Sequence, residues 1–114
     1  MDGGRDAEDL AASFLTHHGL KLIERNYRCR FGEIDLIARD GKTLVFVEVR
    51  MRTRADFGGA AESITAAKRL KLTRTARHYL AQLHAMPACR FDALLLSGKR
   101  AAPEWVKNAF DEAL

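Results

Sequence analysis

The sequence has little cysteine and no long apolar run, and these shortages exclude several classes of protein. Its two cysteines, Cys29 and Cys89, are not spaced as CxxC and have no histidines at ligand-like intervals. We therefore expect neither a zinc site nor a disulfide framework. No apolar run approaches the roughly 20 residues of a membrane span, and residues 1–10 lack the basic and apolar regions of a secretion signal. The 114 residues are expected to form one cytoplasmic domain over 1–114 that binds no membrane.

Acidic residues are missing from one long segment, because no Asp or Glu occurs between residues 63 and 91. The formal net charge is only +4, yet residues 49–91 hold nine bases against two acids. The i, i+4 ion pairs of an ordinary solvated helix cannot form within the acid-free segment. Such a basic block is either a solvated surface or a binding surface for a polyanion. We favour phosphate contacts, which give affinity without base specificity, by Arg52, Arg54, Lys68, Lys71 and Arg74.

Apolar periodicity predicts the order of helices and strands. A three-and-four spacing predicts a helix over 5–18 that ends at Gly19, and a long helix that Ser63 caps and that runs to about His84. A loop is expected over 53–62. Runs of apolar, β-branched and aromatic residues predict strands over 21–27, 33–39, 43–51 and 90–97, with a closing strand or helix over 105–114. This order predicts an α/β fold, in which a mixed sheet is flanked by helices.

Residues 32–50 contain the strongest hairpin signal, an Asp-Gly pair at positions 40 and 41 between two apolar runs. A two-residue turn at that pair would place Asp35 opposite Phe46 and Glu33 opposite Glu48. All three carboxylates would then share one face of the hairpin. Asp35 and Glu48 would be diagonal neighbours, with Cβ atoms roughly 7 Å apart. The opposite face would be filled by Ile34, Leu36, Val45, Val47 and Val49.

Carboxylates placed so close together repel one another, so a positive charge is expected beside them. One alternative is an ordinary salt bridge to Arg50, which shares their face, with Arg52 nearby. The other is Mg²⁺ or Mn²⁺, which prefers oxygen ligands and keeps water molecules free for chemistry. Glu8 stands at the edge of the apolar stripe of the first helix. It either reaches inward to the same site or is an N-terminal acid favoured by the helix dipole.

The segments GEIDLI and LVFVEVR, separated by a short turn, resemble the YraN-like family of uncharacterised small bacterial proteins. That family is similar to the archaeal Holliday-junction resolvases of the restriction-endonuclease-like PD-(D/E)XK superfamily. The match covers most of the chain, from RDAEDLAASFL through NYR and the hairpin to Lys68, RFDALLL and NAF. The resemblance implies a restriction-endonuclease-like fold with an α-β-β-β-α-β core.

The resemblance also implies a metal site built from a helix glutamate, an aspartate of the second strand and the D/E-x-K element of the third strand. Carried over by position, the carboxylates are Glu8, Asp35 and Glu48, with Arg50 where the superfamily usually has lysine. An arginine stays protonated, so it can steady a phosphate but cannot activate the attacking water. Lys68 of the long helix is the nearest candidate to replace the missing lysine.

These observations favour a metal-dependent endonuclease-like protein, with Mg or Mn as its cofactor, that hydrolyses phosphodiesters in branched or structured DNA. The resolvase resemblance implies action as a homodimer. Two alternatives stay open. One is a nucleic-acid-binding protein that keeps the nuclease fold but has lost catalysis through Arg50. The other is a structural protein whose acids pair with arginines.

Overall fold

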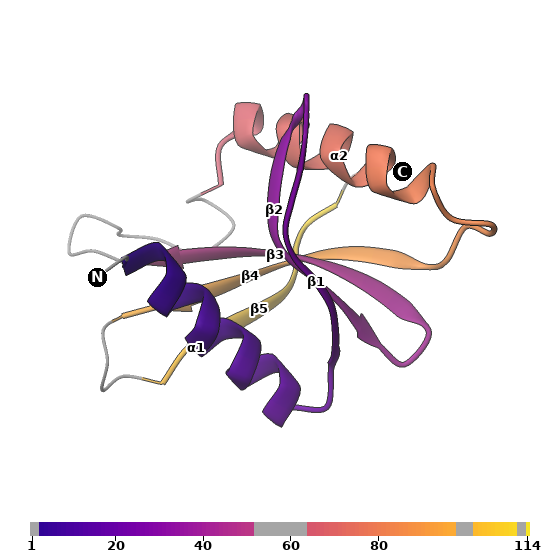
Figure 1. Cartoon of the computed structure of the whole chain (residues 1–114). Helices are drawn as coiled ribbons and strands as arrows, with labels where there is room; N and C mark the ends of the chain where they lie inside the picture. The colour runs from indigo at the N-terminus through magenta and orange to yellow at the C-terminus, as the bar shows by residue number, and fades with distance from the viewer. Residues whose placement is uncertain (1–2, 52–63, 98–101, 112–113) are drawn as a thin grey trace.

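A five-stranded mixed sheet lies between two helices (Figure 1). The computed structural model describes residues 3–51, 64–97, 102–111 and 114. Neighbouring strands in the sheet follow chain order, and only β3 and β4 run parallel, because the chain crosses over through α2 between them. The elements are α1 (Gly3–His17), β1 (Lys21–Cys29), β2 (Gly32–Asp40), β3 (Thr43–Met51), α2 (Ala66–Leu80), β4 (Cys89–Leu96) and β5 (Glu104–Phe110).

The predicted order of helices and strands is confirmed, and the closing segment is a strand, β5. A mixed sheet with one helix on each face is consistent with an α/β nuclease-like fold. The loop expected over 53–62 lies outside the described residues.

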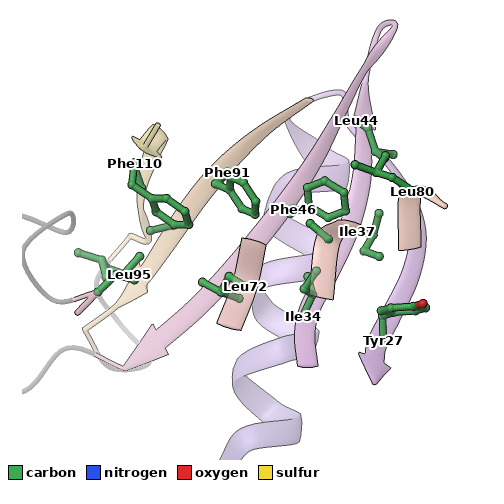
Figure 2. Packing of buried hydrophobic residues seen from close by; sticks show 14 residues of the cluster. Tyr27, Ile34, Ile37, Leu44, Phe46, Leu72, Leu80, Phe91, Leu95 and Phe110 are labelled. Carbon is green, nitrogen blue, oxygen red and sulfur yellow. The ribbon is translucent and has the colours of Figure 1, made fainter. Parts of the chain in front are cut away.

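The sheet separates two apolar cores, one under each helix. The α1 core includes Leu15, Leu36 and Val47, which are all almost fully buried. The core under α2 is built around Phe46, whose ring lies 5.4 Å from that of Phe91 (Figure 2). Because both faces are covered, the central strands read as continuous apolar runs. Each large side chain buried in this way contributes roughly 1.5–3 kcal/mol.

The helix ends follow from local chemistry, but not all at the predicted residues. Gly19 ends α1 as expected, with φ of 93° and the Leu20 N–H donating back to the Leu15 carbonyl at 3.0 Å. Thr65 caps α2 by accepting a hydrogen bond from the Lys68 N–H, and the predicted cap Ser63 lies outside the described residues. The helix ends at Leu80 instead of near residue 84, since the side chains that follow it are exposed and offer no further apolar face.

Candidate functional site

The turn between β2 and β3 differs from the predicted one. Asp40 pairs with Thr43, so the turn consists of residues 41 and 42, and the predicted turn at residues 40 and 41 is wrong. Arg90 of β4 holds Asp40 in its strand through an ion pair of 3.0 Å. The predicted pairing of Asp35 with Phe46 is wrong as well. The observed register differs from the predicted one by two residues. Because side chains alternate faces with a period of two, this difference would leave the hairpin side chains on their predicted faces in regular strands.

The observed register brings Asp35 and Glu48 closer together than predicted. The regular ladder ends where Leu36 pairs with Val47, and one further step places Asp35 opposite Glu48. The backbone N–H of Val49 donates to Oδ2 of Asp35 at 2.8 Å. The carboxylate therefore accepts a hydrogen bond that a backbone carbonyl would accept in a regular ladder. The two acids therefore meet where β2 and β3 part.

Glu33 does not belong to this pair. The predicted pairing of Glu33 with Glu48 is wrong, because the register of β2 with β3 would place Asp35 opposite Glu48, and Glu33 pairs with Arg28 of β1 on its other side. Nε of Arg28 also lies 3.0 Å from Oε2 of Glu33, and both side chains are well exposed. Glu33 is therefore an ordinary surface acid with its own cation.

β2 twists sharply at Asp35. The alternation of a regular strand predicts Ile34 on the same face as Leu36, but Ile34 packs with Ile37 in the α2 core (Figure 2), while Leu36 lies in the α1 core. Asn26 stands beside this point on β1 and has φ of 54°, which residues other than glycine rarely adopt. At this point the carboxylate of Asp35 reaches β3, where it accepts the hydrogen bond from the Val49 N–H.

The Asp35 and Glu48 side chains are largely buried together. Burial, followed by the hydrogen bond and the charge of Glu48, raises the pKa of Asp35 to about 7. The Val49 N–H and the Lys68 ammonium act against this rise without cancelling it. A large share of molecules near neutral pH therefore carries a proton on Asp35, which can donate a hydrogen bond to Glu48.

Lys68 supplies the positive charge beside the two acids. Its Nζ lies 3.2 Å from Oε2 of Glu48, and the Glu48 side chain is only 8% exposed. Oε2 makes no hydrogen bond within the described structure, so this ion pair is its main compensation. Thr65 fixes the first turn of α2 by accepting a hydrogen bond from the Lys68 N–H at 3.2 Å. The predicted substitute lysine thus contacts a predicted metal ligand, and its role in catalysis stays a prediction.

Glu8 of α1 reaches inward toward Asn26, the β1 residue beside the twist of β2. Its Oε1 accepts a hydrogen bond from Nδ2 of Asn26 at 2.7 Å and lies 4.0 Å from the guanidinium of Arg25. Within the described parts of the chain, no group of three His, Cys, Asp or Glu side chains is placed to hold a metal ion. Glu8 as a third metal ligand therefore stays a prediction.

The other basic residues of the predicted site lie around the two acids or outside the described residues. Arg50 is half-buried on β3, two residues after Glu48, and pairs with Leu95 in the sheet. Lys71 and Arg74 are exposed, one and two turns of α2 beyond Lys68. Arg52 and Arg54 lie outside the described residues.

A buried acid that the sequence analysis did not single out is Asp92 of β4. Its carboxylate accepts hydrogen bonds from Nε of Arg90 at 3.0 and 3.2 Å, from Nε1 of Trp105 at 2.9 Å and from the Asn108 N–H at 3.0 Å. The only sequence signal was an acid inside the apolar run RFDALLL. Because its oxygens are satisfied by protein donors, Asp92 ties β4 to β5 and is not a candidate ligand.

A cavity of about 730 Å³ lies beyond the other end of α2. Its lining includes Lys21, Arg39, Tyr79 and Met86. Since α2 has 15 residues and spans about 22 Å, this cavity is remote from Lys68 and the two acids. It takes no part in the site described above.

The mixed sheet between two helices defines an α/β protein, in which two carboxylates and a lysine gather where two strands part. The chain belongs to the Uncharacterised protein family UPF0102, whose model matches residues 7–96. This match confirms the YraN-like resemblance.

The relatives share almost the whole length of the chain. A UPF0102 protein of Nitrosomonas eutropha is 64% identical over 109 residues, which cover 96% of this chain and 93% of the relative. A second UPF0102 protein, from Nitrosospira multiformis, is 62% identical and covers 95% and 92%. One from Cupriavidus taiwanensis is 54% identical and covers 95% and 82%. Their names state no activity.

Both described helices are too short or too polar to cross a membrane.

Proposed function

We propose that the protein is a metal-dependent endonuclease-like enzyme that hydrolyses phosphodiesters in branched or structured DNA of the cytoplasm. One observation carries this proposal: Asp35 and Glu48, from neighbouring strands, converge in a largely buried position beside the ammonium of Lys68. Two acids that must share a proton and a lysine form an unusual arrangement for a purely structural site, because their mutual repulsion destabilises the fold.

The two acids fit a hard divalent cation such as Mg²⁺ or Mn²⁺. Their donors are carboxylate oxygens, which these ions prefer, and within the described structure the buried Oε2 of Glu48 has no hydrogen bond beyond its ion pair with Lys68. Asp35 and Glu48 would hold the ion, with Glu8 as the proposed third ligand. A bound ion would supply charge neutralisation at the phosphodiester and would acidify the attacking water.

The cations around the pair have separate proposed roles. Lys68 carries an ammonium that can donate to a phosphate oxygen, so it is our candidate to replace the lysine that the third strand lacks. Arg50 keeps its charge and presents a planar fork of donors, which suits the steadying of a non-bridging phosphate oxygen. Lys71 and Arg74 extend the positive charge along α2 and would bind the neighbouring phosphates.

A divalent-cation cleavage panel tests the proposal. Four-way junction, flap, single-stranded and duplex DNA are incubated with Mg²⁺ or Mn²⁺ and with wild type, Asp35→Asn or Glu48→Gln. We expect metal-dependent cleavage by wild type and by the control Glu33→Gln, but not by Asp35→Asn or Glu48→Gln. Glu33→Gln is the matched control, because Glu33 lies on the same strand as Asp35 but is exposed and paired with Arg28. Equal cleavage by wild type and Asp35→Asn would refute the assignment.

Metal binding can be measured without activity. Mn²⁺ should raise the melting temperature of wild type and of Glu33→Gln but not that of Asp35→Ala or Glu48→Ala. Gel filtration of the same samples tests the proposed homodimer. A stabilisation by Mn²⁺ that survives both alanine substitutions would place the ion elsewhere.

The second candidate function is nucleic-acid binding without catalysis. It is favoured by the ion pair of Lys68 with Glu48, which partly compensates the acids without a metal, and by the arginine at position 50. The variant Arg50→Lys separates the two functions. If it gains junction cleavage that wild type lacks, the natural protein is a binding protein on a nuclease fold. If wild type already cleaves the junction, nucleic-acid binding without catalysis is refuted as the function.

A further inference from the structure

The turn between β1 and β2 packs against the side of α2. Gly32, the first residue of β2, has φ of 149°, and a Cβ added to it would lie 3.2 Å from Oγ1 of Thr75 and 3.7 Å from Cβ of Lys71. Figure 1 shows the tip of this hairpin beside the helix. Arg30 and Phe31, which precede Gly32, are therefore held next to the basic face of α2.

An aromatic and cationic group stands at this turn. The guanidinium of Arg30 lies 4.8 Å from the centre of the Phe31 ring, and the ring of His78 lies 6.2 Å from it at an angle of 66°. Arg30 and His78 are exposed, and Phe31 is half-buried. These three side chains are called the turn platform below. They present both an aromatic ring and a guanidinium plane on which a base can stack.

One member of the turn platform, His78, is anchored to the core. Nδ1 of His78 lies 2.6 Å from the hydroxyl of Tyr27, and Nε2 of Gln82 donates to the same hydroxyl at 2.6 Å. Tyr27 belongs to the buried core. The anchored His78 ring can therefore contact a base without first being ordered.

Positive charge continues from the turn platform along α2. Lys71, Arg74 and His78 are spaced i, i+3 and i+7 and share the exposed face of the helix. No acid occurs in α2. The acid closest to the turn in sequence, Glu33, is paired with Arg28. A phosphate backbone can therefore follow α2 toward the turn without meeting an unpaired carboxylate of the helix.

The turn platform adjoins the proposed metal site. Gly32 is three residues before Asp35 on β2, a separation of roughly 10 Å along a strand. Lys71, against which the turn packs, lies one helical turn after Lys68. A strand whose phosphate reaches the two acids could thus place a nearby base on Phe31.

We propose that Arg30, Phe31 and His78 form a stacking site for an unpaired base, so that the protein prefers DNA with unpaired nucleotides beside a duplex, such as a flap or an open junction. This inference rests on the proposed function, because it assumes that DNA is bound along α2. The site reads the π-face of the base, so it selects exposed bases without selecting their sequence.

Equilibrium binding in EDTA, which prevents metal-dependent cleavage, tests the stacking site. The probes are a flap duplex carrying 2-aminopurine at the unpaired position and a blunt duplex of equal length. Wild type should bind the flap more tightly and quench its fluorescence. Phe31→Leu, which keeps the apolar volume but removes the ring, should weaken flap binding about tenfold and abolish quenching with little change on the blunt duplex. Phe31→Trp should retain both effects.

Lys107→Gln is the control for the binding experiment and should leave binding unchanged. Lys107 stacks on Trp105 at the far edge of the sheet. The stacking site is overturned if folded Phe31→Leu, checked by its melting temperature, binds and quenches like wild type. If wild type binds flap and duplex equally, this inference fails while the proposed function stands. If wild type binds no DNA and Mn²⁺ does not stabilise it, both fail.

Discussion

Asp35 keeps a proton that an exposed aspartate would lose. Burial is the largest cause of its pKa of about 7, and Glu48 adds a hydrogen bond and a like charge. In the unfolded chain the same group ionises near its usual value of about 4. Between these two values Asp35 binds more protons in the folded state, so its contribution to stability is greatest in acid and is lost as the pH rises toward 7.

The pH dependence gives a test at this residue. Asp35→Asn removes the titrating group, so the decline in unfolding free energy between about pH 4 and pH 7, on the order of a few kcal/mol in wild type, should become shallower. At pH 8 the variant should be the more stable of the two proteins. Urea unfolding across this pH range measures the effect. Glu33→Gln should follow the wild-type curve, and a parallel curve for Asp35→Asn would contradict the assignment.

The contact of Lys68 with Glu48 predicts a coupling between the two side chains. Lys68→Met leaves the largely buried Glu48 without its cation and should destabilise the protein by about 1–2 kcal/mol, less than for a fully buried pair because Lys68 is 40% exposed. In a Glu48→Gln background the same change should cost about 0.5 kcal/mol or less. Urea unfolding of the two single variants and the double variant measures the coupling. Additive effects would show that the pair is not coupled.

At the scale of elements, Gly32 fixes how the β1–β2 hairpin meets α2. Gly32→Ala places a Cβ in a backbone conformation that L residues rarely adopt and 3.2 Å from Oγ1 of Thr75, so we expect a loss of about 2–3 kcal/mol. Gly41→Ala is the matched control. Its φ of 61° is also positive but the space around it is open, so about 1 kcal/mol is expected. Thermal unfolding compares them, and equal losses would argue against the close approach.

Asp92 predicts how firmly β5 is attached to the sheet. Asp92→Ala leaves the indole N–H of Trp105 and the Asn108 N–H without their acceptor and removes one partner of Arg90. We expect a loss of about 3 kcal/mol and faster amide hydrogen exchange in β5. Asp40→Ala removes the more exposed partner of Arg90 and should cost about 1 kcal/mol or less. Unchanged exchange in β5 would contradict the role of Asp92.

At the scale of the whole molecule, charge is concentrated in the middle of the chain and along the exposed face of α2. Binding of a duplex should therefore weaken steeply with salt. Lys71→Gln and Arg74→Gln should each reduce the slope of log K against log salt by about 1. Lys107→Gln on β5 is the control and should leave the slope unchanged. Anisotropy titrations over a range of salt concentrations test this. If neither α2 substitution changes the slope, DNA does not bind along α2.

The two cores show which parts of the fold were readable from the sequence. Alternation and helical spacing are local properties, so the strands and helices were located within a few residues. The hairpin signal placed Asp35 and Glu48 on neighbouring strands. Their predicted shared face does not depend on the error in the turn, because a change of register by two residues preserves faces in a regular hairpin. The predicted face of Ile34 was wrong, because the twist of β2 depends on its contacts with β1 and β3.

The sequence by itself determined the order of elements, the basic block and the family, since these depend on patterns along the chain. Only the tertiary structure decided the hairpin register, and the cation beside Glu48, which comes from α2 instead of the same strand. These outcomes depend on contacts between segments far apart in the chain. A periodic pattern describes each segment alone, so it cannot state which distant side chain completes a site.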